Sequence, residues 1–397
     1  MKTKLFLSLF LLAGSAFSQE QVVTPAPLPS VAPDLAYSTT CDTRNELVTL
    51  SFVGDILVHQ ALYRAVVAGT QNFSQIWNRT DGLIKKADFS VGNLEGPAAL
   101  GIDRRGRDRG DIGFVYDNDV YSGTNFVFNY HPRILSDLKN SGYDLLTTAN
   151  NHSLDRRSIG IDKTLAAAED IGLPTVGTRS SQERNGVFYK IIPVKNMKVA
   201  FVGCTEMTNG MPDPNEQVLM CYKNPERILG LIQEVSARSE VDALIVMPHW
   251  GVEYKHIPEA QQKTFAKKYL EAGATAVIGS HPHVLQPWQK HITKDGRETF
   301  IVYSLGNFVA GQDGLPKQTG AVAYLGLSKE GAQKAKIVGV GYTPTYRQGT
   351  EIFPVGKTDS SEVLNHAAQL FGVKGRIEPT ADLLPFLCSG PRSPKSN

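Results

Sequence analysis

Short β-branched runs alternate with amphipathic helical patterns from about Asn45 onward, and this alternation limits the folds open to the chain. The runs at 46–55, 85–96, 143–152, 198–206, 242–251, 275–283 and 299–307 are typical of strands. Two intervening segments, 132–142 and 258–273, place apolar residues on one helical face, begin at a proline and finish near a glycine. Strands that alternate with such helices predict an α/β fold. A hydrophobic content of 41% is enough for a large core.

The amino-terminal segment has the pattern of a secretory signal peptide, which we place at residues 1–18. Lys2 and Lys4 precede an apolar run, and small residues occupy the −3 and −1 positions before the predicted cleavage site. The run is too short to cross a bilayer, and no second candidate follows it. We therefore expect an exported protein, periplasmic or extracellular, without a transmembrane helix after cleavage. Without Lys2 and Lys4 the formal net charge falls from +2 to 0, so binding to nucleic acid is not expected.

The rest of the chain divides into three predicted segments. A proline-rich tether covers 19–44, the folded domain covers 45–355, and a carboxyl-terminal extension covers 356–397. Four cysteines are an even number for an oxidising compartment, and none has CxxC spacing. We favour bridges between Cys204 and Cys221 and between Cys41 and Cys388, the second tying the extension back. Four reduced, buried thiols are the alternative.

Polar side chains follow five of the predicted strands at the points where the strands end. They are Asp55 and His59, then Asn93 and Glu95, then Asn150, Asn151 and His152, then His249, and finally His281 and His283. Loops at the carboxyl ends of strands in an open α/β sheet gather in one crevice. Carboxylate, amide and imidazole donors suit divalent Zn, Mn or Fe. The number of donors exceeds what one tetrahedral ion accepts, so we expect two ions.

Each of these residues also has an ordinary explanation. Asp55 could cap the helix that follows it, and Asn150 and Asn151 could form turns. His59 is the weakest candidate, because it could lie on a helix that faces elsewhere. His256 is close enough in sequence to His249 to be a rim residue. The arginine-rich segment 102–111 is either a solvated loop or a lip that contacts an acidic substrate.

Six motifs in order carry a family resemblance. They are GDxxxH at 54–59, GNLEGP at 92–97, ANNHSLD at 149–155, PHWGVEY at 248–254, GSHPHVLQP at 279–287 and YSLGNFV at 303–309. With these motifs the chain resembles the bacterial CapA family, associated with poly-γ-glutamate capsule synthesis, within the calcineurin-like metallophosphoesterase superfamily. The resemblance implies a four-layer αββα sandwich of two mixed sheets flanked by helices, with a dinuclear metal site at one end.

The resemblance also implies roles for individual residues. The metal ligands would be Asp55, His59, Glu95, Asn151, His249, His281 and His283, with His152 as general acid. The substrate-binding residues would be Asn93, Asn150, Arg156, Arg157, Glu253 and Asn307. The chain departs from the superfamily pattern at His59, which lies four residues after the aspartate rather than two, and at Glu95, which replaces an aspartate. Arg156 and Arg157 could bind carboxylates or phosphates, or could be surface charges.

The resemblance leaves three functions open. The first is a dinuclear-metal-dependent hydrolase or transferase acting on γ-glutamyl amide bonds of poly-γ-glutamate or an envelope peptide. The second is a metal-dependent phosphoesterase, and the third is a non-catalytic subunit of polymer assembly. Membrane proteins of capsule synthesis would be partners in the first or third function.

Overall fold

The computed structural model describes residues 31–39, 41, 47–124 and 127–388. The predicted signal peptide and most of the predicted tether lie outside these residues. Tether residues 31–39 lie against the folded part of the chain, where the Ala32 amide donates to the Ala368 carbonyl oxygen over 3.0 Å. The Ser38 amide donates to the Glu298 carboxylate over 2.8 Å. Among the described residues, no helix is both long enough and apolar enough to cross a membrane.

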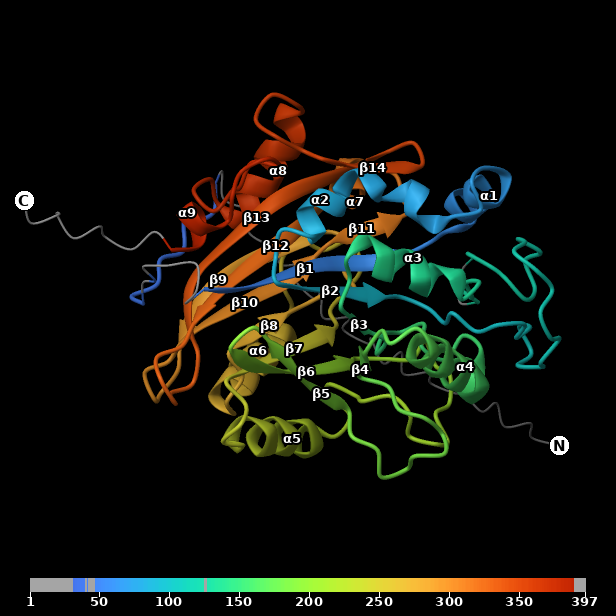
Figure 1. The fold of residues 1–397 in the computed structure, drawn as a ribbon, viewed down its shortest axis with the longest axis horizontal. Helices are drawn as coiled ribbons and strands as arrows, with labels where there is room; N and C mark the ends of the chain where they lie inside the picture. The colour runs from blue at the N-terminus through green and yellow to red at the C-terminus, as the bar shows by residue number, and fades with distance from the viewer. Residues whose placement is uncertain (1–30, 40, 42–46, 125–126, 389–397) are drawn as a thin grey trace, which may run out of the picture.

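Two mixed sheets form the centre of the molecule (Figure 1). In spatial order, the first sheet contains β14 (Glu351–Pro354), β13 (Lys336–Gln348), β12 (Thr319–Ser328), β1 (Val48–Leu57), β2 (Phe89–Leu94), β3 (Leu145–Thr147) and β4 (Thr175–Val176), and β11 (Asn307–Ala310) also pairs with β1. The second contains β5 (Tyr189–Val194), β6 (Met197–Thr205), β7 (Ala243–His249), β8 (Ala276–Ile278), β10 (Glu298–Leu305) and β9 (Leu285–Ile292). Strands β1 to β4 are mutually parallel, as are β6, β7, β8 and β10.

The sheets pack face to face through an apolar core. Val48, Leu50 and Phe52 alternate along β1 and point toward the second sheet, because successive strand residues face opposite sides. The rings of Phe89 on β2 and Phe201 on β6 stack across this core, with centroids 5.3 Å apart. The two inner faces therefore exclude water along most of the sandwich.

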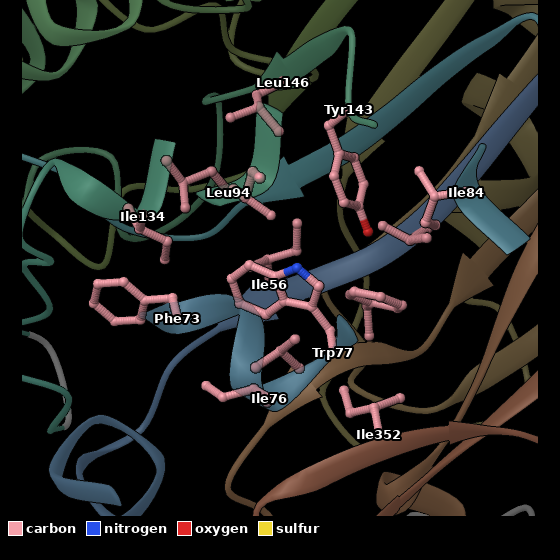
Figure 2. Close-up of a cluster of buried hydrophobic side chains, with 14 of the residues drawn as sticks. Ile56, Phe73, Ile76, Trp77, Ile84, Leu94, Ile134, Tyr143, Leu146 and Ile352 are labelled. Carbon is pink, nitrogen blue, oxygen red and sulfur yellow. The ribbon is translucent and has the colours of Figure 1, made fainter. Parts of the chain in front are cut away.

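Helices cover the two outer faces. The first sheet is covered by α1 (Gln60–Ala68), η1 (Phe73–Ile76), η2 (Asn78–Thr80), α2 (Asp81–Ile84) and α3 (Arg133–Ser141), with part of α4 (Arg157–Asp170). Figure 2 shows Trp77 at the centre of this layer, between Ile56 and Ile352. The second sheet is covered by α5 (Pro225–Ala237) and α6 (Ala260–Glu271). The predicted four-layer αββα sandwich is thus confirmed.

A helix near the carboxyl end of the described chain packs against both sheets. Phe371 of α8 (Ser361–Phe371) lies 4.9 Å, between ring centroids, from Trp288 on β9 and 5.1 Å from Tyr342 on β13. The short helices α7 (Leu315–Gln318) and α9 (Leu384–Leu387) complete the set. The predicted domain boundary at residue 355 stays a prediction, but α8, beyond it, contributes to the core between the sheets.

Both predicted disulfide pairings are present. Cys204 and Cys221 close a loop after β6, and Cys41 and Cys388 join the two ends of the described chain, each pair with Cα atoms 5.2 Å apart. The described residues contain no free cysteine.

Candidate metal centre

Asp55 lies where the two sheets meet, at the carboxyl end of β1. Gly54 makes this possible, because a Cβ atom there would lie 1.8 Å from the Gly306 carbonyl oxygen. The glycine pair lets β11 approach β1 closely, and the Asp55 amide donates to the same carbonyl oxygen over 3.0 Å. The Asp55 side chain is completely buried. The close approach therefore places its carboxylate between the strand ends of both sheets.

The neighbouring strands of the first sheet supply two side-chain amides, linked by a hydrogen bond, that hold the Asp55 carboxylate in place. The Asn93 Nδ2 atom donates to Asp55 Oδ1 over 2.9 Å and lies 3.3 Å from His249 Nδ1. The Asn150 Nδ2 atom donates to the Leu94 carbonyl oxygen over 2.7 Å and to Asn93 Oδ1 over 3.3 Å. Asn93 and Asn150 thus orient Asp55.

The second sheet supplies three imidazoles. His249 ends β7, and its ring centroid lies 4.7 Å from that of His281. His281 and His283 follow β8 on either side of Pro282, and both adopt positive φ angles, 98° and 57°. Non-glycine residues rarely adopt such angles, and they do so mainly where the surrounding structure holds a functional site in place. The His281 amide donates to both carboxylate oxygens of Asp55, over 3.3 and 3.2 Å.

Five of the predicted ligands form two overlapping groups whose donor atoms lie within 4.8 Å of one another. One group is Glu95, His281 and His283, and the other is Asp55, Glu95 and His249. Glu95 belongs to both groups, the position expected of a bridging carboxylate. Asn151 lies beside them, with its Oδ1 atom 2.8 Å from His249 Nε2. The structure thus brings together side chains that could hold at least one metal ion.

The Glu95 carboxylate has the environment of a metal ligand. It is completely buried, and neither oxygen has a hydrogen-bond partner among the described residues. Burial and the charge of Asp55 raise the pKa of Glu95 to about 8. A buried carboxylate without donors is costly, on the order of several kcal/mol. A divalent cation between the two donor groups would satisfy both oxygens, so the residues fit a metal ion.

The imidazoles are held in different states of protonation. Burial lowers the pKa of His249 to about 3 and also lowers that of His281, which leaves both rings neutral, the form that binds metals. Burial also acts to lower the pKa of His283, but the charge of Glu95 and the hydrogen bond to Asp55 outweigh it and raise the pKa to about 9. Burial alone would raise the pKa of Asp55, but the hydrogen bond to His283 and the charge of that ring outweigh it and lower the pKa.

His152 lies at the side of this cluster with its own carboxylate. Its Nδ1 atom is 2.8 Å from Asp155 Oδ2, which also accepts from the Phe128 amide over 2.7 Å. The ring packs edge-on against Phe128, with centroids 4.8 Å apart. Burial acts to lower the pKa of His152, but the charge of Asp155 outweighs it and raises the pKa. A buried histidine that favours its protonated form can act as a general acid.

Other predicted site residues lie at the edge. His59 is at the start of α1, and its Nδ1 atom lies 3.1 Å from both the Leu57 carbonyl oxygen and the Gly311 nitrogen, outside both donor groups. Asn307 holds His283, with 2.9 Å between Asn307 Oδ1 and His283 Nδ1. Glu253 is exposed on the loop after β7.

The two predicted substrate-binding arginines are placed differently from each other. Arg156 is fully buried, and its guanidinium donates to the carbonyl oxygens of Ile102, Asp155, Asp119 and Val120. It therefore fastens loops together and has no surface open to a ligand. Arg157 is exposed, and its Nε atom donates to the Arg105 carbonyl oxygen over 3.2 Å.

Sequence reasoning missed two residues that support the site. Asp155 appeared only as the last letter of a motif, although it holds His152. Asn209 lies in the loop closed by the Cys204–Cys221 bridge, and its Oδ1 atom accepts from Asn151 Nδ2 over 3.4 Å. Proximity in the sequence to the motif histidine could have indicated Asp155. The irregular loop of Asn209 gives no comparable signal.

The fold and the site together define a two-sheet α/β protein with a buried candidate centre for divalent metal at the carboxyl ends of its strands. The chain belongs to the family described as bacterial capsule synthesis protein PGA_cap, whose model matches residues 49–312. This confirms the family resemblance seen in the motifs.

Curated relatives agree with this family. The chain is 26% identical over 296 residues to the PGA biosynthesis protein CapA of Bacillus subtilis (strain 168), a match that covers 74% of this chain and 71% of the relative. It is 28% identical over 272 residues to the capsule biosynthesis protein CapA of Bacillus anthracis, covering 68% of this chain and 61% of that protein.

Solved structures show a weaker likeness. The NAD nucleotidase of Haemophilus influenzae is 12% identical with a TM-score of 0.44, and the match covers 83% of this chain and 63% of that one. A putative 5'-nucleotidase from Staphylococcus aureus is 15% identical with a TM-score of 0.42, covering 82% and 58%.

Proposed function

We propose that this protein is a metal-dependent hydrolase or transferase that cleaves γ-glutamyl amide bonds in an anionic capsule or envelope polymer such as poly-γ-glutamate. The observation that carries the proposal is the buried Glu95 carboxylate, which lacks hydrogen-bond donors and is shared by two donor groups. Membership of a capsule synthesis family supports the choice of polymer.

The donors named above would hold one or two ions of Mn, Zn or Fe. They are Asp55, Glu95, His249, His281 and His283, with the Asn151 amide beside them. A divalent ion bound there would polarise the amide carbonyl and make water a stronger nucleophile. The neutral imidazoles of His249 and His281 are ready to bind such an ion without losing a proton.

The chain's own residues would supply the proton for the leaving amine. His152 uses its Nδ1 atom on Asp155, so the proton for transfer would be on Nε2. The Asp155 carboxylate stabilises the imidazolium form before transfer. Asn93 and Asn150 keep Asp55 fixed while charge changes nearby.

We propose that the protein acts outside the cytoplasm, alongside membrane proteins of capsule synthesis. Both disulfides support an oxidising compartment, because such bridges persist there and are rare in the cytosol.

The test is turnover by the purified protein loaded with Mn, Zn or Fe. We expect shorter chains and new amino groups from poly-γ-glutamate, or free glutamate from a γ-glutamyl peptide, with loss of turnover in the His152→Ala variant. An aryl phosphate assayed in parallel distinguishes the alternative function, a metal-dependent phosphoesterase, from amide cleavage. Hydrolysis of the phosphate without amide cleavage would contradict the amide assignment. Less than one ion per chain and no turnover in any metal state would favour a non-catalytic assembly role.

A further inference from the structure

Residues 101–110, which include most of the arginine-rich segment 102–111, form an ordered hairpin. The Asp103 amide donates to the Arg107 carbonyl oxygen over 3.0 Å, and the Gly106 amide donates to the Asp103 carbonyl oxygen over 2.9 Å. The Asp103 carboxylate accepts from the amides of Arg105 and Arg107, each over 2.9 Å. Gly106 has a φ of 77°, the left-handed conformation that closes such turns. Arg104 and Arg105 therefore occupy the tip of a fixed turn.

The base of this hairpin is fastened beside the His152–Asp155 pair, at the side of the candidate metal centre. Arg156 Nε donates to the Ile102 carbonyl oxygen over 3.0 Å, and Arg156 directly follows Asp155, the partner of His152. Figure 1 shows the teal segment after β2 extending beyond the end of that strand. Since the site lies at the same carboxyl ends, the hairpin projects from the side of the molecule that holds the site.

The two carboxylates of the hairpin are paired with cations. The buried Asp103 carboxylate pairs with Arg107 Nε at 2.7 Å, and Asp108 pairs with Lys163 Nζ at 3.0 Å. Asp111, at the end of the segment, accepts from the Gly113 amide over 2.8 Å.

Three exposed cations are left over. Arg104, Arg105 and Arg109 have no carboxylate partner within the part of the chain that the structure describes. Arg157 is a fourth exposed arginine, and its side chain lies against Gly106. Because a guanidinium matches a carboxylate with two parallel hydrogen bonds, an exposed and unpaired set on a rigid turn suits a polycarboxylate.

We propose that the 101–110 hairpin is a binding surface for an acidic polymer and guides its carboxylates toward the candidate metal centre. The choice of poly-γ-glutamate as this polymer rests on the proposed function. The chain as a whole has a formal net charge of only +2, so the attraction comes from this local set rather than from a basic face.

The experiment measures binding of fluorescein-labelled poly-γ-glutamate to the full chain by fluorescence anisotropy, without added metal. The triple variant Arg104→Ala/Arg105→Ala/Arg109→Ala removes only exposed side chains, so we expect an unchanged melting temperature. We expect its dissociation constant to rise at least tenfold. The affinity of the unmodified protein should fall with added salt more steeply than that of the variant.

The matched control removes three exposed cations, one between α5 and β7, one between β9 and β10, and one at the start of β13. In this control, Arg238, Lys294 and Lys336 are changed to alanine, and we expect less than a twofold effect. An equal loss of binding in both triple variants would overturn the proposal, as would unchanged binding after removal of the hairpin arginines. Tighter binding of single-stranded DNA or of phosphatidylglycerol vesicles than of the polymer would overturn the polycarboxylate assignment.

A second measurement separates this proposal from the catalytic one. The hairpin is proposed to bind the many carboxylates of the polymer, so the triple variant should cleave a γ-glutamyl dipeptide normally while cleaving the polymer poorly. If the loaded protein cleaves nothing, the proposed function fails, yet the difference in polymer binding between the two variants still tests the hairpin.

Discussion

At the scale of single residues, burial acts on the pKa in opposite directions for the two kinds of candidate metal ligand. It raises the pKa of the Glu95 carboxyl to about 8 and lowers the pKa of the His249 imidazole to about 3, because low polarity disfavours each charged form. Neutral imidazole is ready to bind a cation, whereas the carboxyl must first lose its proton. The attraction of a bound cation would offset the free energy that burying the Glu95 charge costs.

Strand-end position in the sequence was sufficient to indicate the donors Asp55, Glu95, His249, His281 and His283, which the structure brings together. Arg156 could not be placed this way, since its orientation depends on three carbonyl groups distant in the sequence, those of Ile102, Asp119 and Val120. His59 fits the strand-end pattern, but its ring contacts the backbone at Leu57 and Gly311 instead.

The pair of His152 and Asp155 gives a prediction at this scale. Asp155→Asn removes the charge that favours the imidazolium, so the pKa of His152 should fall. We expect turnover of a γ-glutamyl peptide to decrease by about 10²–10⁴-fold near neutral pH, with the profile shifted to lower pH. The measurement is the pH dependence of kcat/KM.

Asp162→Asn is the matched control for this variant. Asp162 also lies on the α4 side of the site, but it binds Ser181 and Gln217 rather than a histidine. An unchanged pH profile in Asp155→Asn, with metal content as in the unmodified protein, would exclude His152 as the proton donor.

At the scale of elements, the close contact between β1 and β11 fixes Asp55 relative to Asn307. Gly54→Ala would place a methyl group within 1.8 Å of the Gly306 carbonyl oxygen, so the two strands would have to separate. We expect a loss of unfolding free energy on the order of 2 kcal/mol or more, with weaker metal binding. Urea unfolding and metal titration measure the two effects.

Gly82→Ala is the control for this glycine. Gly82 lies in α2 with no atom within 4 Å of a Cβ placed there, so the change should be neutral or stabilising by up to about 1 kcal/mol. Equal stability of the two variants would mean that the contact of β1 with β11 does not need a glycine.

A histidine in helix α8 makes the free energy of unfolding depend on pH. His366 of α8 packs edge-on against His256, with ring centroids 5.0 Å apart, and burial followed by the charge of His256 lowers its pKa to about 4. A folded-state pKa below the unfolded value of about 6.5 means that the unfolded chain binds the proton first as pH falls. The contribution is therefore fully present above pH 6.5 and is lost as pH falls toward 4.

We expect the His366→Phe variant to lose this pH-dependent contribution to the unfolding free energy. Between pH 7 and pH 5, the unmodified protein should lose about 2 kcal/mol more unfolding free energy than the variant, measured by urea unfolding. The site histidines are common to both proteins and cancel in the difference. A difference that is the same at pH 7 and pH 5 would show that His366 does not titrate in this range.

The predicted strands and helices are present, but several boundaries moved. The helix expected from Pro132 begins at Arg133, and the helix expected from Pro258 begins at Ala260, where Glu259 and Gln262 form a capping box. The strand expected over 143–152 covers only Leu145–Thr147, because the following asparagines turn the chain into the site. Hydrophobic periodicity shows that an element exists, whereas its ends depend on side-chain caps and tertiary contacts.

At the scale of the whole molecule, the Cys41–Cys388 bridge closes the chain across 347 residues. The expected compartment, with Cys204 paired to Cys221 across a short loop, left Cys41 and Cys388 as the predicted second pair. The αββα layers followed from the family resemblance. The contribution of α8 to the core between the sheets was not foreseen, because a short amphipathic helix near the chain end does not reveal which strands it will cover.

The Cys41–Cys388 bridge allows a prediction about the stability of the whole molecule. Replacing Cys41 and Cys388 by serine removes a constraint on the unfolded chain, and long closed loops give the larger effects. We expect the unfolding free energy to fall by about 6 kcal/mol, measured by urea unfolding of the oxidised proteins. The Cys204→Ser/Cys221→Ser variant is the comparison, with a separation of 17 residues and an expected loss of about 3 kcal/mol. A midpoint unchanged by loss of the long bridge would contradict the expected constraint.

The binding of divalent metal is best measured by calorimetric titration of the metal-free protein with Zn or Mn, alongside the isosteric Glu95→Gln variant. The unmodified protein should bind one or two ions per chain, and the variant should bind at least tenfold more weakly, because the amide lacks the charge that the cation needs. His256→Gln, outside both donor groups, should bind normally. Less than one ion bound per unmodified chain, or equal affinity in Glu95→Gln, would contradict a metal centre at the ends of these strands.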